Sequence, residues 1–315
     1  MATSAESLDI DEPIEVLLRQ AEALRLMPRT DATQQELERL GARVARLRQE
    51  IYSALTPWQR VLVARHPQRP RTRDHLSHLF TDFTELHGDR HFADDPGIVA
   101  GFARFDGNAV MVVGHQRSLP PDLVDARPEG YRKALRCMRL AEKCGRPVVT
   151  FVESAGLSPD VGSEARGMAD AIARNLRAMA MLEVPVVVVV TGEACGGTAV
   201  ALAVGDYLLM LEYAVYSVVP AESAALMLWG DRARAGDAAD GLKLTASDLI
   251  RLGVIDEVVP EPLGGAHADP VRASRLLFEP LRAALATQSA RSSAARVDER
   301  YARLRRIGHT GIYGA

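Results

Sequence analysis

The stretch that decides the fold holds two apolar runs, RPVVTFVE at 146–153 and VPVVVVV at 184–190, each followed by a glycine-containing break. The first break is SAG at 154–156, and the second is TGEACGGT at 191–198. Apolar runs of this length, bounded by turn residues, are typical of buried strands. A helical segment at 163–182 lies between them, so the pattern predicts neighbouring parallel strands in an α/β sheet.

The two breaks also carry the clearest chemical signal in the chain. Each places free backbone N–H groups at the start of a helix, where unpaired donors and the helix dipole favour an anion. Two such turns on neighbouring strands can converge on one developing oxyanion. The pattern indicates acyl-thioester or ureido chemistry rather than phosphate binding, although a tight strand-to-helix turn with no ligand fits the same residues.

Bulk composition narrows the class of protein and its partners. The chain has 315 residues, of which 47% are hydrophobic and 25% charged, as is typical of a soluble globular protein. The formal net charge of −3 argues against nucleic acid as the main partner. No apolar run exceeds the length of a strand, and the N-terminus has no apolar core, so we expect neither a membrane span nor a signal peptide.

Cysteine and histidine spacing gives no sign of a metal site. The three cysteines form no C-x-x-C pair, and an odd number without a framework fits a reducing compartment. The histidines His66, His87 and His115 are scattered along the chain without the spacing of metal ligands. We therefore expect no metal in this chain and a cytoplasmic location.

The chain divides into three predicted parts. Apolar positions three or four residues apart predict a helical hairpin in 1–56, with its break near Pro28. This hairpin is either a packing appendage or a partner-binding arm. Residues 57–285 form the predicted main domain, and 286–315 form a basic helical tail. Three prolines in 57–70 suggest a linker that wraps a surface.

Strand and helix patterns continue on both sides of the quoted stretch. Asp106-Gly107 between apolar runs predicts a β-hairpin. After Pro128 the alternation predicts an α/β domain with helices packed on the sheet. The expected helices are 129–144, 163–182, 197–204, 221–228, 246–252 and 271–307, and the expected strands are 147–153, 185–190, 207–211 and 216–219.

Several long strings in the chain resemble one family. They are IYSALTPWQR at 51–60, FTDFTELHGDR at 80–90, PEGYRKA at 128–134, AIARNL at 171–176 and PEPLGGAH at 260–267. In this order they are similar to the carboxyltransferase α subunit of bacterial acetyl-CoA carboxylase, over about residues 10 to 285. Several ordered strings are far more specific than any single motif.

The resemblance implies a fold, a reaction and partners. The fold would be α/β, a crotonase/Clp-protease-like spiral core of ββα units with an N-terminal helical hairpin and C-terminal helices. The reaction would move CO2 from carboxybiotin, held on a separate biotin carboxyl carrier protein, to the α-carbon of an acyl-CoA such as acetyl-CoA, giving malonyl-CoA. The partner would be a β-type subunit of the same fold, which carries the zinc, in an α2β2-like hetero-oligomer.

The resemblance also assigns roles around the two turns. A glycine pair suits anion binding because absent side chains let the biotin ring approach the backbone N–H groups. The assigned residues are Gly196 and Gly197 at the ureido oxygen, Gly156 and Leu157 as the second wall, Glu193, Cys195 and Ala155 at the cofactor, and Tyr131, Arg132 and Lys133 at the coenzyme A phosphates.

For some of these residues the sequence also allows another role. Cys195 is either a small packed side chain or, at a helix start, a nucleophile, although the sequence assigns it no histidine partner. Residues 131–133 equally fit a solvated helical face. The basic segment 300–306 is expected to be an exposed helix that serves assembly or the coenzyme A phosphates.

The chain departs from the family strings at the expected site. ESAGLSPD at 153–160 replaces the family's DTPGAYPG, and EACGG at 193–197 replaces EGGSGG with one residue fewer. The loop at 118–126 lacks the family's RNFGMP. We hypothesise a divergent paralogue with an altered acyl substrate, in a specialised pathway rather than housekeeping fatty acid biosynthesis. Two rival hypotheses are a biotin-independent crotonase-type lyase or decarboxylase, and a non-catalytic structural subunit of a carboxylase.

Overall fold

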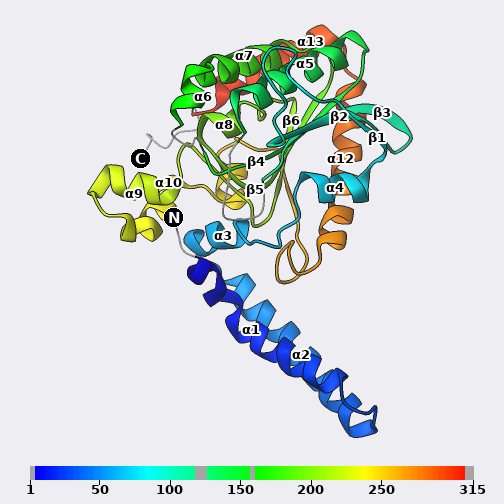
Figure 1. Ribbon diagram of the computed structural model, residues 1–315, viewed down its shortest axis with the longest axis vertical. Helices are drawn as coiled ribbons and strands as arrows, with labels where there is room; N and C mark the ends of the chain where they lie inside the picture. Colours follow the sequence, from blue (N-terminus) through cyan, green and yellow to red (C-terminus); the bar gives the residue numbers. More distant parts are fainter. Residues whose placement is uncertain (1–3, 118–125, 157–159, 309–315) are drawn as a thin grey trace.

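A computed structural model describes residues 4–117, 126–156 and 160–308. It consists of an α/β body and a helical hairpin that extends away from it (Figure 1). Among the described residues, no helix is long and apolar enough to cross a membrane.

The N-terminal hairpin has the predicted helices and the predicted break. Helix α1 is Ser4–Arg25 and helix α2 is Asp31–Ser53. Thr30 caps α2, because its side chain accepts a hydrogen bond from the backbone N–H of Thr33. The two helices bury one apolar seam, which contains Ile14, Leu17, Leu40 and Val44. The domain limits at residues 56 and 285 stay predictions.

The expected linker at 57–70 is wrong in its first half. Residues Pro57–Ala64 form helix α3, and Val61 to Ala64 are buried. Pro57 stands at the first helical position, where its missing N–H costs nothing, and Thr56 with Gln59 forms a capping box. Pro57 therefore marks a helix start rather than a linker. Helix α4, Thr72–Leu79, follows.

One sheet forms the centre of the body, in the order β1-β2-β3-β4-β5-β6-β8, with β7 paired to the far end of β5. The first three strands are antiparallel, and the remaining pairings are parallel. The strands are β1 Thr81–Glu85, β2 Ile98–Phe105, β3 Asn108–His115, β4 Val148–Ser154, β5 Val186–Cys195, β6 Tyr207–Leu211, β7 Val215–Ser217 and β8 Glu257–Val259. The turn between β2 and β3 has positive φ at Asp106 and Gly107, which confirms the predicted hairpin.

Helices cover both faces of the sheet, so every residue of β4 and β5 is buried. On one face, Phe151 stacks on His75 of α4, and Phe105 packs on Phe278 of α12, Pro270–Ser289. On the other face, His115 contacts Tyr131 of α5, Pro128–Lys143. Helix α7, Met168–Met181, packs beside α5 (Figure 1). The predicted α/β class is confirmed.

Some element bounds differ from the prediction. The expected helix at 163–182 is interrupted by Gly167 at φ 81°, which separates α6, Val161–Ala165, from α7. Strand β5 continues through the expected break at residue 191 and ends at Cys195, so that α8, Gly196–Val200, is short. The lobe at the left of Figure 1 contains α9, Ala221–Trp229, and the unpredicted α10, Ala235–Leu242, and α11 is Ala246–Arg251.

The C-terminal helix α13, Ser293–Arg306, is largely exposed as its charge suggested, but three of its arginines, Arg296, Arg300 and Arg303, are buried. Arg300 is 1% exposed and forms an ion pair with Asp206, with N–O distances of 2.8 and 2.9 Å. Its guanidinium also donates to the carbonyls of Met179 and Leu182. Arg303 is buried as well and donates to the carbonyl of Val254. These arginines anchor the helix to the body, and they do not face an acyl-CoA.

Replacing Arg300 should destabilise the protein strongly. In Arg300→Met, the carboxylate of Asp206 stays buried without its charge partner, a change that typically costs about 3–5 kcal/mol. We expect a clearly lower midpoint in urea or thermal unfolding. The matched control is Arg305→Met on the exposed side of the same helix. Equal midpoints for the two variants would contradict the anchoring role of Arg300.

Candidate active site

The two predicted breaks meet at one edge of the sheet. Because β4 and β5 are parallel neighbours, their carboxyl ends lie together. A Cβ atom added at Gly156 would lie 3.8 Å from the Cβ of Cys195 and 3.8 Å from the ring of Pro220. The turn after β4 therefore touches both the end of β5 and the segment before α9. Leu157, the other residue assigned to this wall, lies outside the described residues.

Gly196 and Gly197 begin α8 at the end of β5. The first residues of a helix have no acceptor within that helix for their N–H groups. Gly196 has φ +67°, a conformation that favours glycine, and a Cβ there would lie 3.5 Å from the Val218 carbonyl oxygen. Gly197 is exposed, and a Cβ on it would meet no atom closer than 3.9 Å, in the side chain of Ile172. The pair thus borders free space that a ligand can enter.

Buried hydroxyl groups connect the two turns. Ser154, the last residue of β4, donates to Oγ1 of Thr198 at 2.8 Å. Thr198 donates in turn to the carbonyl of Cys195 at 3.0 Å. The backbone N–H of Gly156 points inward and donates to Oγ of Ser154 over a long 3.4 Å. Gly156 therefore shapes the wall, and the Gly196 N–H faces the Ser217 carbonyl in the β5–β7 pairing, so Gly197 is the better placed donor.

Glu193 is held by an arginine that sequence reasoning missed. Arg65, just after α3, donates to both carboxylate oxygens of Glu193, at 2.7 and 2.8 Å, and also to Glu222 of α9. Glu193 is 2% exposed. Arg65 thus joins three segments of the chain, and the buried Glu193 has no face open to a cofactor. The spacing of 128 residues between Arg65 and Glu193 gives no local signal for the pair.

Cys195 is a packed side chain in this structure. It is buried, and its Sγ lies 3.8 Å from Oε1 of Glu193. Burial, together with the negative charge of Glu193, raises the pKa of the Cys195 thiol. A thiol held neutral is a poor nucleophile, so the geometry favours the packing alternative. Ala155, which was assigned to the same cofactor site, is half-buried in the turn after β4.

The three residues that open α5 do not form a surface for coenzyme A. Tyr131 is fully buried, and its hydroxyl contacts His115 and the carbonyl of Thr198. Lys133 is 1% exposed, and its Nζ lies 2.6 Å from Oδ1 of Asp94. Both the phosphate-binding expectation and the solvated-face alternative are therefore wrong for these two side chains.

Arg132 is partly exposed, but it too has internal partners. Its Nε donates to Oδ2 of Asp89 at 2.7 Å, and one terminal nitrogen donates to the carbonyl of Arg166. The partners Asp89 and Asp94 lie about 40 residues upstream, and only Asp89 belongs to the string at 80–90 that resembled the family. These ion pairs hold α5 against the segment that follows β1.

Glu153 is a buried carboxyl beside the first turn that the assigned set did not include. It is 4% exposed, lies 3.4 Å from a guanidinium nitrogen of Arg117, and has one oxygen without a hydrogen-bond partner. Burial raises the pKa of Glu153 against the opposing effect of Arg117 and Arg69. A Cβ at Gly192 would come within 3.0 Å of its side chain, so glycine is needed there for space.

One cluster of potential metal ligands lies away from the turns, where the hairpin meets the body. His66, expected to be isolated, stacks on His267 with ring centroids 3.8 Å apart, and Asp11 lies 3.2 Å from Nε2 of His267. Rings that are nearly parallel at this separation cannot both direct an in-plane lone pair at one ion. The hydroxyl of Tyr52 also donates to Asp11. The cluster is better suited to anchoring the hairpin than to binding a metal.

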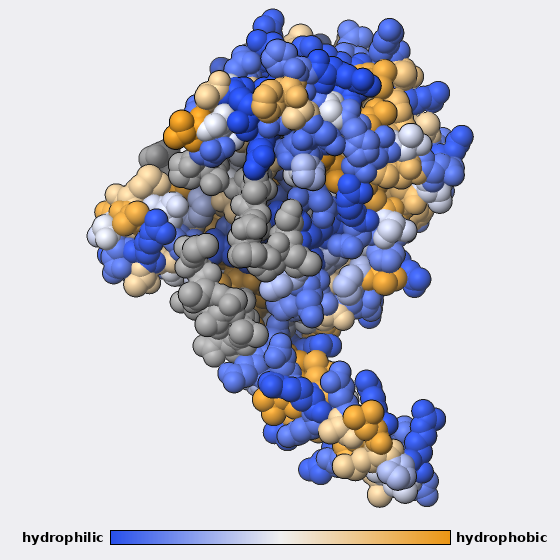
Figure 2. Space-filling model, viewed as in Figure 1, coloured by the Kyte–Doolittle hydropathy of each residue, from blue (hydrophilic) through white to orange (hydrophobic). Residues whose placement is uncertain are grey.

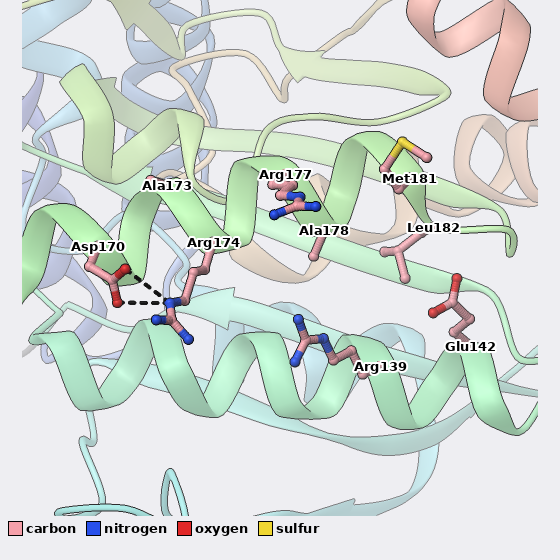
Figure 3. Close-up of a pocket in the computed structure, with 9 residues that line it drawn as sticks. All are labelled: Arg139, Glu142, Asp170, Ala173, Arg174, Arg177, Ala178, Met181 and Leu182. Carbon is pink, nitrogen blue, oxygen red and sulfur yellow. Dashed lines mark hydrogen bonds and ion pairs between the residues drawn. The ribbon is translucent and has the colours of Figure 1, made fainter.

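A surface groove of about 820 Å³ runs between α5 and α7, away from the two turns. Figure 3 shows Arg139 and Arg177 projecting into it, while Arg174 forms an ion pair with Asp170. None of the residues assigned to the site lines this groove. The catalytic assignment therefore concerns the glycine turns, and the groove has no part in it.

Comparison with known proteins identifies relatives over nearly the whole chain. A family model described as acetyl co-enzyme A carboxylase carboxyltransferase-like matches residues 7–308. The acetyl-coenzyme A carboxylase carboxyl transferase subunit alpha of Geobacter sulfurreducens is 51% identical over 271 residues, which are 84% of this chain and 85% of that protein. The protein of the same name from Thioalkalivibrio sulfidiphilus is 47% identical, covering 96% and 97% of the two chains.

Solved structures share the fold at low sequence identity. Transcarboxylase 12S, with methylmalonyl-coenzyme A and methylmalonic acid bound, has a TM-score of 0.59 and 21% identity, covering 71% of this chain and 42% of that chain. A Pseudomonas malonate decarboxylase hetero-tetramer in complex with coenzyme A has a TM-score of 0.54 and 17% identity, covering 67% and 89%. These likenesses confirm the expected crotonase-like fold.

Acid should destabilise the protein through its buried histidines. Burial lowers the pKa of His115 to about 4, below the ordinary 6.5, so the unfolded chain binds more protons between these values. The free energy of unfolding should then fall as pH drops from 6.5 towards 4, by up to ~1.4 kcal/mol per pH unit for this one group. Denaturant titrations across this range should show a shallower fall for His115→Gln. The exposed His91→Gln serves as control, and identical slopes for His115→Gln and the parent would contradict the prediction.

Proposed function

This chain belongs to the acetyl-coenzyme A carboxylase carboxyltransferase-like family, and from that premise we propose how it works as the α-type subunit of the enzyme. It is a carboxyltransferase component of a biotin-dependent acyl-CoA carboxylase. The proposed reaction transfers CO2 from carboxybiotin to the α-carbon of acetyl-CoA, giving malonyl-CoA. The observation that carries the site assignment is the exposed Gly197, in the turn beside the end of β4.

The glycine pair is the proposed binding site for the ureido oxygen of biotin. The biotin ring needs room to reach the backbone at this turn. The nearest atom to a Cβ on Gly197 would be 3.9 Å away, so a ring can approach there. Carboxybiotin supplies the carboxyl group and, once CO2 has left, a ureido anion that can accept the α-proton. The N–H group of Gly197 stabilises this developing negative charge more than the neutral ground state, and such a donor is typically worth about 3–4 kcal/mol.

The structure gives the neighbouring side chains a supporting role in this proposal. Glu193 and Cys195 are buried under the turn, so they fix the backbone from below and do not touch the ring. Arg65 neutralises Glu193 and Glu222, which keeps uncompensated negative charge away from the anion site. No side-chain general base is required, because the ureido anion can take the proton.

A β-type subunit and a biotin carrier protein are the proposed partners. The named relatives are alpha subunits of acetyl-coenzyme A carboxylase. Next to the glycine turn, Val218 is 73% exposed, and Met227 and Leu228 of α9 are 67% and 66% exposed. Apolar residues are visible on the lobe at the left of Figure 2. An exposed apolar surface of this kind supports a partner subunit that closes over the site. An α2β2-like assembly with zinc on the β-type subunit belongs to the same proposal.

The proposed location is the cytoplasm, and the proposed acyl group is acetyl. All three cysteines are free, as expected in a reducing compartment. The sequence differs from the family strings at 153–160 and 193–197. The proposal therefore also includes a related acyl thioester as the substrate and a specialised pathway. The non-catalytic alternative loses support, because the turn remains open and its framework is intact.

Filling the space at Gly197 should abolish turnover without unfolding the chain. In the reconstituted complex with the β-type subunit and the biotinylated carrier, Gly197→Leu should lower kcat for malonyl-CoA formation by about 100-fold or more. The matched control is Gly41→Leu on α2, where a Cβ meets nothing within 4 Å. Thermal unfolding checks that both variants remain folded.

Unchanged turnover in Gly197→Leu would contradict the site assignment and favour a structural subunit. A further assay offers malonyl-CoA without biotin or carrier. The proposal predicts no decarboxylation above the uncatalysed rate, whereas rapid decarboxylation would favour a biotin-independent enzyme.

A further inference from the structure

The groove between α5 and α7 contains two arginine side chains without partners. Arg139 comes from α5 and Arg177 from α7, so they reach the groove from the two helices that border it (Figure 3). Both are exposed, and in the described parts of the chain neither forms a hydrogen bond or an ion pair. Arg65, Arg69 and Arg300, by contrast, each bind a carboxylate of the protein. The groove thus holds two guanidinium groups that are free to bind an anion.

The two carboxylates that line the groove already have partners within the chain. Asp170 forms an ion pair with Arg174, with an N–O distance of 2.8 Å. Oε1 of Glu142 accepts a hydrogen bond from the backbone N–H of Glu183 at 2.9 Å. The lining residues comprise three arginines and two carboxylates, so the groove carries a net positive charge. An anion that enters it meets guanidinium groups whose donors are still available.

The size of the groove and its apolar part point to a small organic molecule rather than a bare ion. Its volume of about 820 Å³ lies within the range of about 300–1,000 Å³ that is typical of small-molecule pockets. Met181 also lines the groove and is 63% exposed. Its thioether offers an apolar contact beside the arginines. Guanidinium groups bind phosphate in a bidentate manner, and the three oxygens of a phosphate ester can bond to two such groups.

We propose that this groove binds a small organic molecule that carries a phosphate group. Arg139 and Arg177 bind the phosphate from two sides, and Met181 contacts the apolar part. The ligand is a molecule other than acetyl-CoA, because the groove lies away from the two turns and none of the residues assigned to the reaction lines it. This inference goes beyond the proposed function and does not depend on it.

Calorimetric titration of the full-length chain with phenyl phosphate tests the proposal. At about pH 8 this probe is a dianion with an apolar ring. We expect saturable binding that is tighter than the binding of inorganic phosphate or benzoate. Arg139→Gln and Arg177→Gln should each raise the Kd about tenfold, because each removes a charge-assisted hydrogen bond. Met181→Ser should abolish the advantage of phenyl phosphate over inorganic phosphate. The matched control is Arg275→Gln, an exposed arginine of α12 on the other face of the sheet.

Three results of the titrations would overturn the proposal. The first is the absence of saturable binding. The second is a Kd that neither groove arginine changes. The third is an equal loss of affinity in Arg275→Gln, which would show general charge attraction. The rival occupant is an acidic segment of a partner protein. In that case phenyl phosphate would not bind, whereas Arg139→Gln and Arg177→Gln would weaken assembly with the β-type subunit or the carrier protein, and the proposal would fail.

Steady-state kinetics of the reconstituted complex distinguish a separate ligand from the phosphates of the substrate. In Arg139→Gln and Arg177→Gln, we expect KM for acetyl-CoA to stay within about twofold of the parent value, because the substrate binds elsewhere. A rise of about tenfold would show that the groove holds the phosphates of coenzyme A, and it would overturn a separate site. The binding measurements need no turnover, so they decide the inference even if the proposed function is wrong.

Discussion

The parallel pairing of β4 with β5 is the constraint on which the rest of this structure depends. Parallel strands end at the same edge of a sheet, so the turns that follow them become neighbours without any long-range side-chain recognition. The register shifts after the pair Val152–Val190, and Ser154 then lies opposite Ala194. Two residues of β4 thus span the same distance as four residues of β5. This irregularity brings Ser154 within reach of Thr198.

Buried ion pairs then attach distant segments to this edge. Arg65 joins α3 to Glu193 at the end of β5, and Arg69 joins Glu261 to the carbonyl of Thr191 on the same strand. Arg300 attaches the C-terminal helix to Asp206 beneath β6. Each pair is desolvated, so its net contribution to stability is small, whereas loss of one partner leaves a buried charge and is costly. The main effect of these ion pairs is to hold the attached segments in fixed positions around the site.

The sheet could be predicted from sequence because its signals are local. A run of five valines needs burial on both faces, and Asp106-Gly107 supports positive φ wherever it occurs. The two glycine breaks could also be predicted, because they too are local signals. The second strand nevertheless continues to Cys195, because β7 pairs with its end. The two turns were thus predicted at one edge of the sheet, with an error of a few residues.

Long-range pairing accounts for what the sequence could not predict. Lys133 and Arg300 are charged residues on amphipathic helices, and their burial depends on carboxylates 39 and 94 residues away. His66 and His267 stack although about 200 residues separate them in the chain. Residues 57–70 were predicted as a linker because the helix-starting role of Pro57 depends on Thr56 and on the core below. Periodicity identifies a face, but only the fold shows which polar side chains find partners on it.

The most direct test is a structure of this chain bound to its β-type subunit and to biotin. The account predicts the ureido oxygen at hydrogen-bond distance, about 3 Å, from the backbone nitrogen of Gly197. It also predicts the Cys195 carbonyl turned away, toward Thr198. Biotin bound elsewhere, with the Gly197 N–H bonded to an acceptor of the protein itself, would contradict the central claim.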